Sequence, residues 1–306
     1  MLNILLETKI HSGKQFMFEI AVEQQQYKTY ILSDRNAQSQ VAIAPERGAI
    51  ITSWQIGEKE IFYLDKERFS DPSLSVRGGI PLLFPICGNL PDDNYSLDGK
   101  SYRLKQHGFA RDLPWEVTDR SQEDSASLTL SLKSNEKTRT VYPFDFQLDF
   151  TYKLKGNTLE LIYRHTNLSD RPMPFATGIH PYFLVTDKNK LEFDLPSSKY
   201  KIKSDSKVND FSGKFDFSQD EIDFAFIDLS NNSASAIDRD RNLKLTLKYD
   251  SEYSTLVFWT VKGKDFYCLE PWSAPRDALN TGESILVAKP NETVETSISI
   301  IAESLS

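Results

Sequence analysis

Apolar and polar residues alternate with a period of two along much of this chain. In residues 144–154 (FDFQLDFTYKL), the apolar side chains occupy every second position and the polar ones lie between them. The same alternation recurs at residues 127–133, 243–249 and 293–302. Residues 255–261 (TLVFWTV) are almost wholly apolar or β-branched, which is typical of a strand buried on both faces. The pattern therefore predicts many β-strands, most of them with one buried face.

Polar turn clusters separate these runs, and we find no amphipathic helix longer than about two turns. Many short strands with no long helical period predict an all-β, antiparallel sandwich or barrel. Residues 199–223 are the most polar stretch and predict a long connection, although it contains Phe211, Phe215 and Phe217. Since neither a linker nor a repeat divides the chain, we expect residues 1–306 to form one domain.

The segment 77–115 has neither strand nor helix periodicity and is rich in Gly, Pro and aromatic residues. Loops on a rigid scaffold are where binding and catalytic groups concentrate. Within it, HGFAR places His107 four residues from Arg111, next to a glycine that lets the backbone approach a ligand closely. A glycine-rich sandwich loop with a surface histidine remains the alternative interpretation.

The four histidines have different surroundings. His11 follows the first strand-like segment and is expected in solvent, and His165 lies in an alternating strand, where a partly buried structural role is expected. His180 lies in GIHPYF, where Pro181 restricts the backbone and aromatic side chains follow. His107 and His180 are thus candidates for chemistry, with a structural role at a strand end as the alternative for His180.

Two carboxylates stand out from the many solvated ones. Glu270 follows the apolar run 266–269 and precedes Pro271 and Trp272, so desolvation should raise its proton affinity, as suits a general base. A buried structural acid paired with an arginine is the alternative. Asp223, in EIDFAF, is a second candidate.

Composition excludes several classes of partner. A net charge of −8 without any Lys/Arg run argues against nucleic acid and anionic membrane as partners. Cys87 and Cys268 are too few for a disulfide framework and predict free thiols in a reducing compartment. Because the N-terminus lacks the features of a signal peptide and no stretch is long enough to span a bilayer, we expect a cytoplasmic protein.

Known motifs narrow the chemistry further. The chain has no GxSxG, HExxH, P-loop or dinucleotide-binding glycine motif. A mononuclear metal site of His107, His180 and Glu270 is one alternative, although no short-spaced ligand pair supports it. A glycosidase using Glu270 and Asp223 is another. The remaining candidates are two histidines, the carboxylate of Glu270, arginines and aromatic residues. This combination favours a site that acts on a polyhydroxylated ring without a metal or cofactor.

Four segments carry a resemblance to a known family. RGGIPLLFPICG at 77–88, HGFAR at 107–111, GIHPYF at 178–183 and LEPW at 269–272 stand in the order found in the aldose 1-epimerases, or galactose mutarotases, and in the related glucose-6-phosphate 1-epimerases. The chain resembles this family from about Val41 to its C-terminus. The resemblance implies an antiparallel β-supersandwich with an open cleft on one sheet.

The resemblance also implies a role for each candidate residue. Glu270 matches the base at the sugar C1 hydroxyl, His180 the acid at the ring oxygen, and His107 a second histidine that binds and polarises there. Such an acid suits a group that titrates near neutrality. Asp223 and Arg77 match groups that hold sugar hydroxyls. The implied enzyme needs no cofactor and no metal.

RGGIP and HGFAR are more similar to the hexose-6-phosphate and LacX-like branches than to the mutarotases proper. In the phosphate branch, the arginines matching Arg77 and Arg111 hold the phosphate. The alternative is that Arg77 holds a hydroxyl while Arg111 pairs with Asp112 or another acidic residue of the loop. The expected substrate is thus a hexose or hexose 6-phosphate, and a non-catalytic carbohydrate-binding protein is the alternative function. The sequence predicts no oligomeric state.

Overall fold

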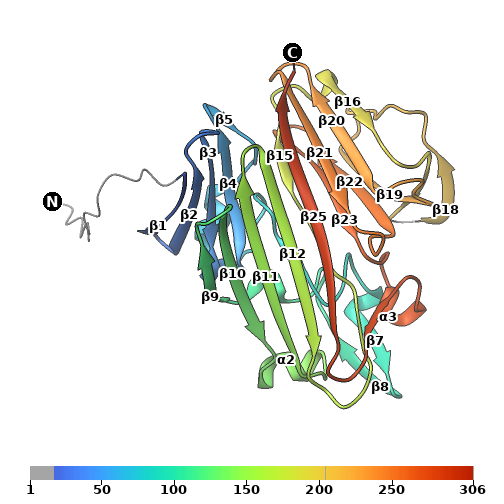
Figure 1. The fold of residues 1–306 in the computed structure, drawn as a ribbon. Coiled ribbons are helices and arrows are strands. Elements are labelled where there is room, and N and C mark those ends of the chain that lie inside the picture. The colour runs from blue at the N-terminus through green and yellow to red at the C-terminus, as the bar shows by residue number, and fades with distance from the viewer. Residues whose placement is uncertain (1–16, 204, 306) are drawn as a thin grey trace, which may run out of the picture.

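The computed structural model describes residues 17–203 and 205–305, and it is built almost entirely of antiparallel β-sheets (Figure 1). Every pair of neighbouring strands among these residues runs antiparallel. The fold is that of a β-supersandwich, as the family resemblance implies. His11 lies outside the described residues.

The largest strands form one eight-stranded sheet, here called the long-strand sheet. In spatial order its members are β16 (Leu191–Asp194), β20 (Ser233–Asp238), β21 (Leu243–Tyr249), β25 (Thr293–Ser304), β12 (Thr158–Asn167), β11 (Phe146–Lys155), β10 (Ala126–Lys133) and β9 (Glu116–Ser121). Four of the predicted alternating runs thus become adjacent or nearly adjacent strands of a single sheet.

A second sheet, here called the cavity sheet, lies against the first. Its members are β18 (Asp205–Asp210), β17 (Lys199–Ile202), β19 (Glu221–Ile227), β22 (Thr255–Val261), β23 (Phe266–Trp272), β14 (Gly178–Ile179) and β6 (Leu82–Leu83), and β15 (Tyr182–Leu184) also pairs with β23. A five-stranded sheet precedes both: β1 (Phe18–Gln24), β2 (Lys28–Asp34), β3 (Ser39–Ala44), β4 (Ile50–Ile56) and β5 (Lys59–Glu60).

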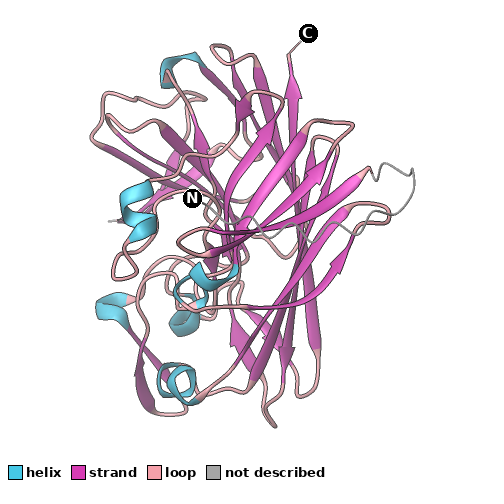
Figure 2. Ribbon diagram, turned by 90° about the vertical axis from the view of Figure 1, so that its left-hand side faces the viewer, coloured by secondary structure: helices cyan, strands magenta, loops and turns pink. Residues whose placement is uncertain are grey.

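The remaining elements are short. Two small two-stranded sheets pair β7 (Asn94–Leu97) with β8 (Lys100–Arg103), and β13 (Met173–Phe175) with β24 (Leu286–Ala288). The helical segments are α1 (Lys66–Ser70), α2 (Glu136–Val141), α3 (Ala278–Thr281), η1 (Pro45–Arg47), η2 (Pro91–Asp93), η3 (Ala110–Asp112) and η4 (Lys188–Lys190). Figure 2 shows them as short segments within the loops. No helix among the described residues is long and apolar enough to cross a membrane.

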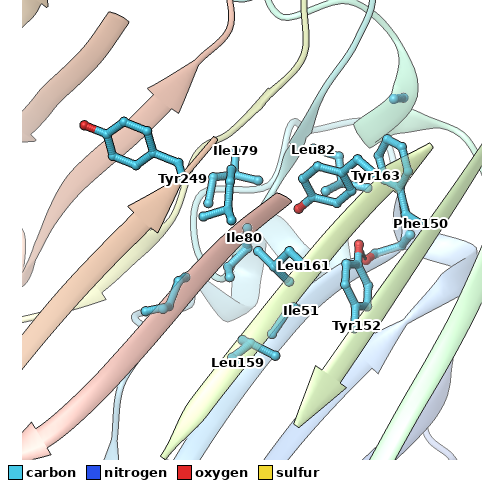
Figure 3. Packing of buried hydrophobic residues seen from close by; sticks show 14 of the residues in the cluster. Ile51, Ile80, Leu82, Phe150, Tyr152, Leu159, Leu161, Tyr163, Ile179 and Tyr249 are labelled. Atoms are coloured by element: carbon cyan, nitrogen blue, oxygen red, sulfur yellow. Dashed lines mark hydrogen bonds between the residues drawn. The ribbon is translucent and has the colours of Figure 1, made fainter. Parts of the chain in front are cut away.

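The core lies between the sheets, and alternation determines which side chains enter it. On β11, Leu148, Phe150, Tyr152 and Leu154 are at most 1% exposed, whereas the polar residues between them are half-buried. Figure 3 shows side chains of β11 and β12, such as Phe150 and Leu161, packed with residues such as Ile179 and Leu82 from β14 and β6. Burying one such side chain contributes roughly 2 kcal/mol to stability. This core holds the cavity sheet in place.

The prediction of a long connection at residues 199–223 is wrong. This stretch contains β17, β18 and the start of β19. Its polarity reflects the position of β18 at the edge of the cavity sheet, where charged side chains also discourage pairing with another chain. Phe211, Phe215 and Phe217 pack against the core. Phe215, for example, stacks on Phe258 with ring centroids 3.7 Å apart.

His165 is entirely buried rather than partly buried as predicted. Its ring stacks against Phe84 and Phe175 and lies edge-on to Phe150. Desolvation lowers the pKa of His165 to about 3. The imidazole is therefore an uncharged part of the aromatic core.

This burial predicts a loss of stability in acid. The pKa of an unperturbed histidine is about 6.5. The unfolded chain binds a proton at His165 more tightly than the folded protein does. The free energy of unfolding therefore falls as pH falls from about 6.5 towards 3. At pH 5 the expected loss is about 2 kcal/mol. His165→Phe has no imidazole to protonate at this position. The free energy of unfolding, measured with urea, should therefore differ less between pH 7 and pH 5 in the variant than in the wild type. An identical pH effect in both proteins would contradict the prediction.

Candidate active site

All six predicted site residues line one cavity of about 350 Å³. Glu270 and Asp223 come from β23 and β19, His180 from the link between β14 and β15, and Arg77, His107 and Arg111 from the predicted loop segment. The complete lining is Arg68, Ser75, Val76, Arg77, Gln106, His107, Arg111, His180, Tyr182, Lys203, Glu221, Asp223, Val257, Trp259, Glu270, Trp272 and Arg276. Its volume falls within the range of small-molecule sites.

The strand register explains why residues far apart in sequence meet here. Asp223 on β19 pairs with Trp259 on β22, and Val257 on β22 pairs with Glu270 on β23. Because side chains alternate along a strand, Glu270 and Trp272 point to the same face. The floor of the cavity is thus a patch of three neighbouring strands.

Glu270 is buried in the cavity floor, and its side chain is only 1% exposed. Its Oε1 lies 3.5 Å from His180 Nε2, and its Oε2 accepts a hydrogen bond of 3.1 Å from Trp272 Nε1. Desolvation and then the negative charge of Asp223 raise the pKa of Glu270 well above its ordinary value. The carboxyl group is therefore a strong base that faces the cavity.

His180 is held between aromatic rings. It stacks on Tyr182, with ring planes 11° apart and centroids separated by 4.8 Å, and it meets Trp259 edge-on. Desolvation and then the positive charge of Arg111 lower the pKa of His180 to about 3. This differs from the expected titration near neutrality, because the ring is almost completely enclosed. Burial thus disfavours the charged forms of both side chains.

His107 has an unusual backbone conformation, with φ of +67°. The next residue, Gly108, also has positive φ, and a Cβ there would stand 2.1 Å from the carbonyl oxygen of Phe84. The glycine of HGFAR is thus required for the loop to approach Phe84 so closely. Since the backbone amide of His107 donates to Gly88 O at 2.7 Å, the two loops are also tied together at the histidine.

The contacts of His107 determine which ring nitrogen carries its proton. Gly88 N–H donates to Nδ1 at 3.1 Å, which leaves Nε2 as the protonated nitrogen of a neutral ring. Gln106 Nε2 lies 3.2 Å from His107 Nε2. Two donors cannot bond to each other, so Gln106 accepts from this nitrogen only when its amide is turned so that the oxygen faces the ring. Desolvation, followed by the charge of Arg111, lowers the pKa of His107 well below its ordinary value. His107 is therefore a fixed, uncharged hydrogen-bond donor.

The two predicted arginines differ in exposure. Arg111 is half-buried, and its Nη2 donates to the backbone oxygen of Gln106 at 2.8 Å. It forms no ion pair with Asp112 among the described residues, in contrast to the alternative considered above. Arg77 is exposed at the rim of the cavity.

The sequence did not single out Arg276, which lies in the loop after β23. Its Nη2 donates to both oxygens of Asp223, at 2.7 and 2.8 Å. Its position only six residues after Glu270, in the loop that follows the same apolar strand, was the available signal. Trp259, Gln106 and Lys203 also line the cavity without having been singled out.

The lining contains five basic residues and only three acidic ones, although the whole chain has a net charge of −8. The basic residues are Arg68, Arg77, Arg111, Lys203 and Arg276, and the acidic ones are Glu221, Asp223 and Glu270. The cavity is thus locally positive, which favours a ligand with a negative group.

The possible metal-ligand atoms that lie close together are not those of the predicted alternative site, which was His107, His180 and Glu270. Among the described residues, it is His180, Cys268 and Glu270 whose donor atoms lie within 4.8 Å of one another. Burial and the charge of Glu270 raise the pKa of the Cys268 thiol well above its ordinary value.

Comparisons with solved structures confirm the fold. The Slr1438 protein from Synechocystis sp. PCC 6803 is 42% identical, with a TM-score of 0.89, and the match covers 96% of this chain and 100% of that one. A galactose mutarotase-like protein from Clostridium acetobutylicum is 20% identical, with a TM-score of 0.80 and coverage of 94% and 99%. The second likeness shows the galactose mutarotase-like fold alone.

Two curated relatives are similar in sequence. Protein LacX (chromosomal) of Lactococcus lactis subsp. lactis is 28% identical over 245 residues, which make up 71% of this chain and 80% of LacX. The "Putative glucose-6-phosphate 1-epimerase" of Salmonella typhimurium is 31% identical over 144 residues, or 46% of this chain and 44% of that protein. The sequence model of the aldose 1-epimerases matches residues 30–300. With the expected motifs gathered around one cavity, this match shows that the chain belongs to the aldose 1-epimerase family.

Proposed function

We propose that this protein is a cofactor-independent aldose 1-epimerase that interconverts the α and β anomers of a hexose or hexose 6-phosphate. The observation that carries the proposal is the pair of Glu270 and His180, which lie 3.5 Å apart in a cavity of the size of a sugar. Anomer exchange needs one base at the C1 hydroxyl and one acid at the ring oxygen of the same molecule.

In the proposed reaction, Glu270 removes the proton from the C1 hydroxyl while His180 protonates the ring oxygen. The C1–O5 bond breaks, the aldehyde carbon turns about the C1–C2 bond, and the reverse proton transfers close the ring on the other face. His107 donates its fixed Nε2 proton towards the ring oxygen, Asp223 binds sugar hydroxyls, and Arg77 binds the phosphate of a hexose 6-phosphate. The reaction therefore starts with Glu270 deprotonated and His180 protonated.

The electrostatics of the pair support this direction of proton flow. The reactive form has a carboxylate at Glu270 and an imidazolium at His180. Ring opening moves a proton onto Glu270 and removes one from His180, which gives the uncharged pair. Burial favours that uncharged pair, because it raises the pKa of Glu270 and lowers that of His180. The same desolvation favours both proton transfers once the charged pair has formed, and it equally disfavours the charged pair itself.

A non-catalytic sugar-binding protein on this scaffold is the second candidate, since a fold does not determine function. Only an enzyme would need an acid and a base that face each other in the cavity. The test is the rate of anomer exchange of freshly dissolved α-D-glucose by polarimetry, and of glucose 6-phosphate by exchange NMR. If micromolar protein leaves both rates at the buffer value while the sugars still bind, the binding function is correct and the epimerase is not.

The excess of basic residues in the cavity favours the phosphorylated substrate, as does the name of the Salmonella relative. We expect kcat/KM to be higher for glucose 6-phosphate than for glucose, and the difference to shrink as salt concentration rises. Arg77→Ala and Arg111→Ala should each lower kcat/KM for the phosphate at least about tenfold, because each removes charge-assisted hydrogen bonds. Their effect on free glucose should be smaller.

Arg103→Ala is the matched control for this experiment. Arg103 is an exposed arginine whose ion pair with Asp93 lies outside the cavity lining, so its removal should leave both substrates unaffected. A preference for free glucose that neither Arg77→Ala nor Arg111→Ala alters would show that the arginines do not bind phosphate.

A further inference from the structure

Arg276 joins three separate segments of the active site. Its guanidinium binds both oxygens of Asp223 on β19 and lies over the ring of Trp272 on β23, 5.1 Å from the ring centroid. Its aliphatic stem packs against Gly88, where a Cβ would stand 2.4 Å from Arg276 Cγ. The side chains of Arg276 and Asp223 are only 17% and 15% exposed, so solvent screens this ion pair weakly.

Each of these three contacts leads to a group that we place in the reaction. Trp272 donates its indole N–H to Glu270, and Gly88 donates its backbone N–H to Nδ1 of His107. Asp223 binds Arg276 directly. A single side chain thus supports the base, the fixed histidine donor and the sugar-binding carboxylate without any contact of its own to Glu270 among the hydrogen bonds of the described residues.

Arg276 also influences the ionisation of Glu270 through its charge. Asp223 and Glu270 are two carboxylates that face one cavity, and like charges in one site oppose each other's ionisation. The charge of Asp223 raises the pKa of Glu270, and the charge of Arg276 acts in the opposite direction. The titratable and charged groups that interact with Glu270 or lie beside it are His180, Tyr182, Cys87, Cys268, Asp223, Arg111 and Arg276.

We propose that Arg276 is a positioning residue of the epimerase. It neutralises and orients Asp223, so that one carboxylate binds the sugar while the neighbouring carboxylate can ionise and act as the base. The inference rests on the proposed function and assigns to this loop arginine the task of keeping the two carboxylates in different roles. It also explains why the residue is half-buried beside Trp272 rather than exposed at the rim of the cavity.

The kinetic test uses a double-mutant cycle on Arg276 and Asp223. Arg276→Ala should lower kcat/KM about tenfold to a hundredfold, because it leaves an unpaired carboxylate beside the base. In an Asp223→Asn background the same change should cost less than about threefold, since no charge is left to neutralise. Additive effects in the cycle would overturn the proposal.

Arg276→Lys provides a rescue that a purely structural role would not predict. Both hydrogen bonds to Asp223 come from a single nitrogen, so one ammonium group can replace them, whereas a lysine cannot reproduce the planar stacking on Trp272. We expect Arg276→Lys to retain most of the activity that Arg276→Ala loses. If lysine is as damaging as alanine in a folded protein, the packing of the guanidinium matters and its charge does not, which contradicts the proposal.

A titration without sugar separates this inference from the proposed function. The carboxyl carbon of Glu270 can be followed by ¹³C NMR and assigned from its absence in Glu270→Gln. We expect Arg276→Ala to raise the pKa of Glu270 further and Asp223→Asn to reverse that rise. Arg239→Ala is the matched control, because Arg239 forms a similar pair with Glu192 on the surface.

The titration and the kinetics can fail independently. If the Glu270 titration moves as expected but the wild type exchanges no anomers, the charge arrangement stands and the proposed function is wrong. If the wild type is active and the titration is the same in Arg276→Ala and Arg239→Ala, the role of Arg276 is wrong. Should Arg276→Ala not fold, Arg276→Lys and Asp223→Asn still test the direction of both effects.

Discussion

Glu270→Gln should reduce anomer exchange by at least about a hundredfold, the usual effect of removing a positioned general base. Glutamine keeps the shape of the side chain, and its amide oxygen can still accept the hydrogen bond from Trp272. What it loses is the ability to take a proton from the C1 hydroxyl. The measurement is kcat by polarimetry or exchange NMR, with the substrate that the wild type prefers.

Folding should survive this change, because burying a carboxylate costs more free energy than burying a hydrogen-bonded amide. The melting temperature of Glu270→Gln should therefore be equal to that of the wild type or higher. The control is Glu221→Gln. Glu221 is an exposed acid at the same cavity, and it takes no part in the proposed proton transfers. A folded Glu270→Gln protein with near-normal turnover would show that Glu270 is not the base.

His180→Asn should lower kcat by about a hundredfold and change KM much less. A proton donor acts mainly in the transition state, so its loss reduces turnover more than binding. Asparagine can still donate a hydrogen bond to the ring oxygen but cannot deliver a proton to it. The comparison of kcat with KM under saturating sugar therefore separates the acid from a group that only binds.

The matched control is His165→Phe. That ring is also buried and uncharged, but it lies in the aromatic core away from the cavity lining. Its replacement should leave kcat per folded molecule unchanged while it alters stability in acid as described above. Equal losses of turnover in the two histidine variants would mean that the loss at His180 reflects misfolding rather than lost acid catalysis.

The sequence by itself determined the class of fold. Alternation such as that of residues 144–154 depends only on the two-residue repeat of a strand, so it predicts strands and their buried faces without any tertiary information. It failed at residues 199–223, because an edge strand has no partner on one side and tolerates polar residues on both faces. Only the sheet order reveals that β18 is such an edge.

Motifs also brought forward six residues of the cavity. Three of them lie in HGFAR and GIHPYF, where the backbone demands of the loops leave a visible trace in Gly and Pro. Pairing across strands leaves no such trace. The meeting of Asp223 with Arg276, the orientation of His107 by Gly88, and the burial that makes His180 uncharged depend on contacts between distant segments. The tertiary structure alone decided these features, because register and desolvation are properties of the packed sheets and not of any local stretch of chain.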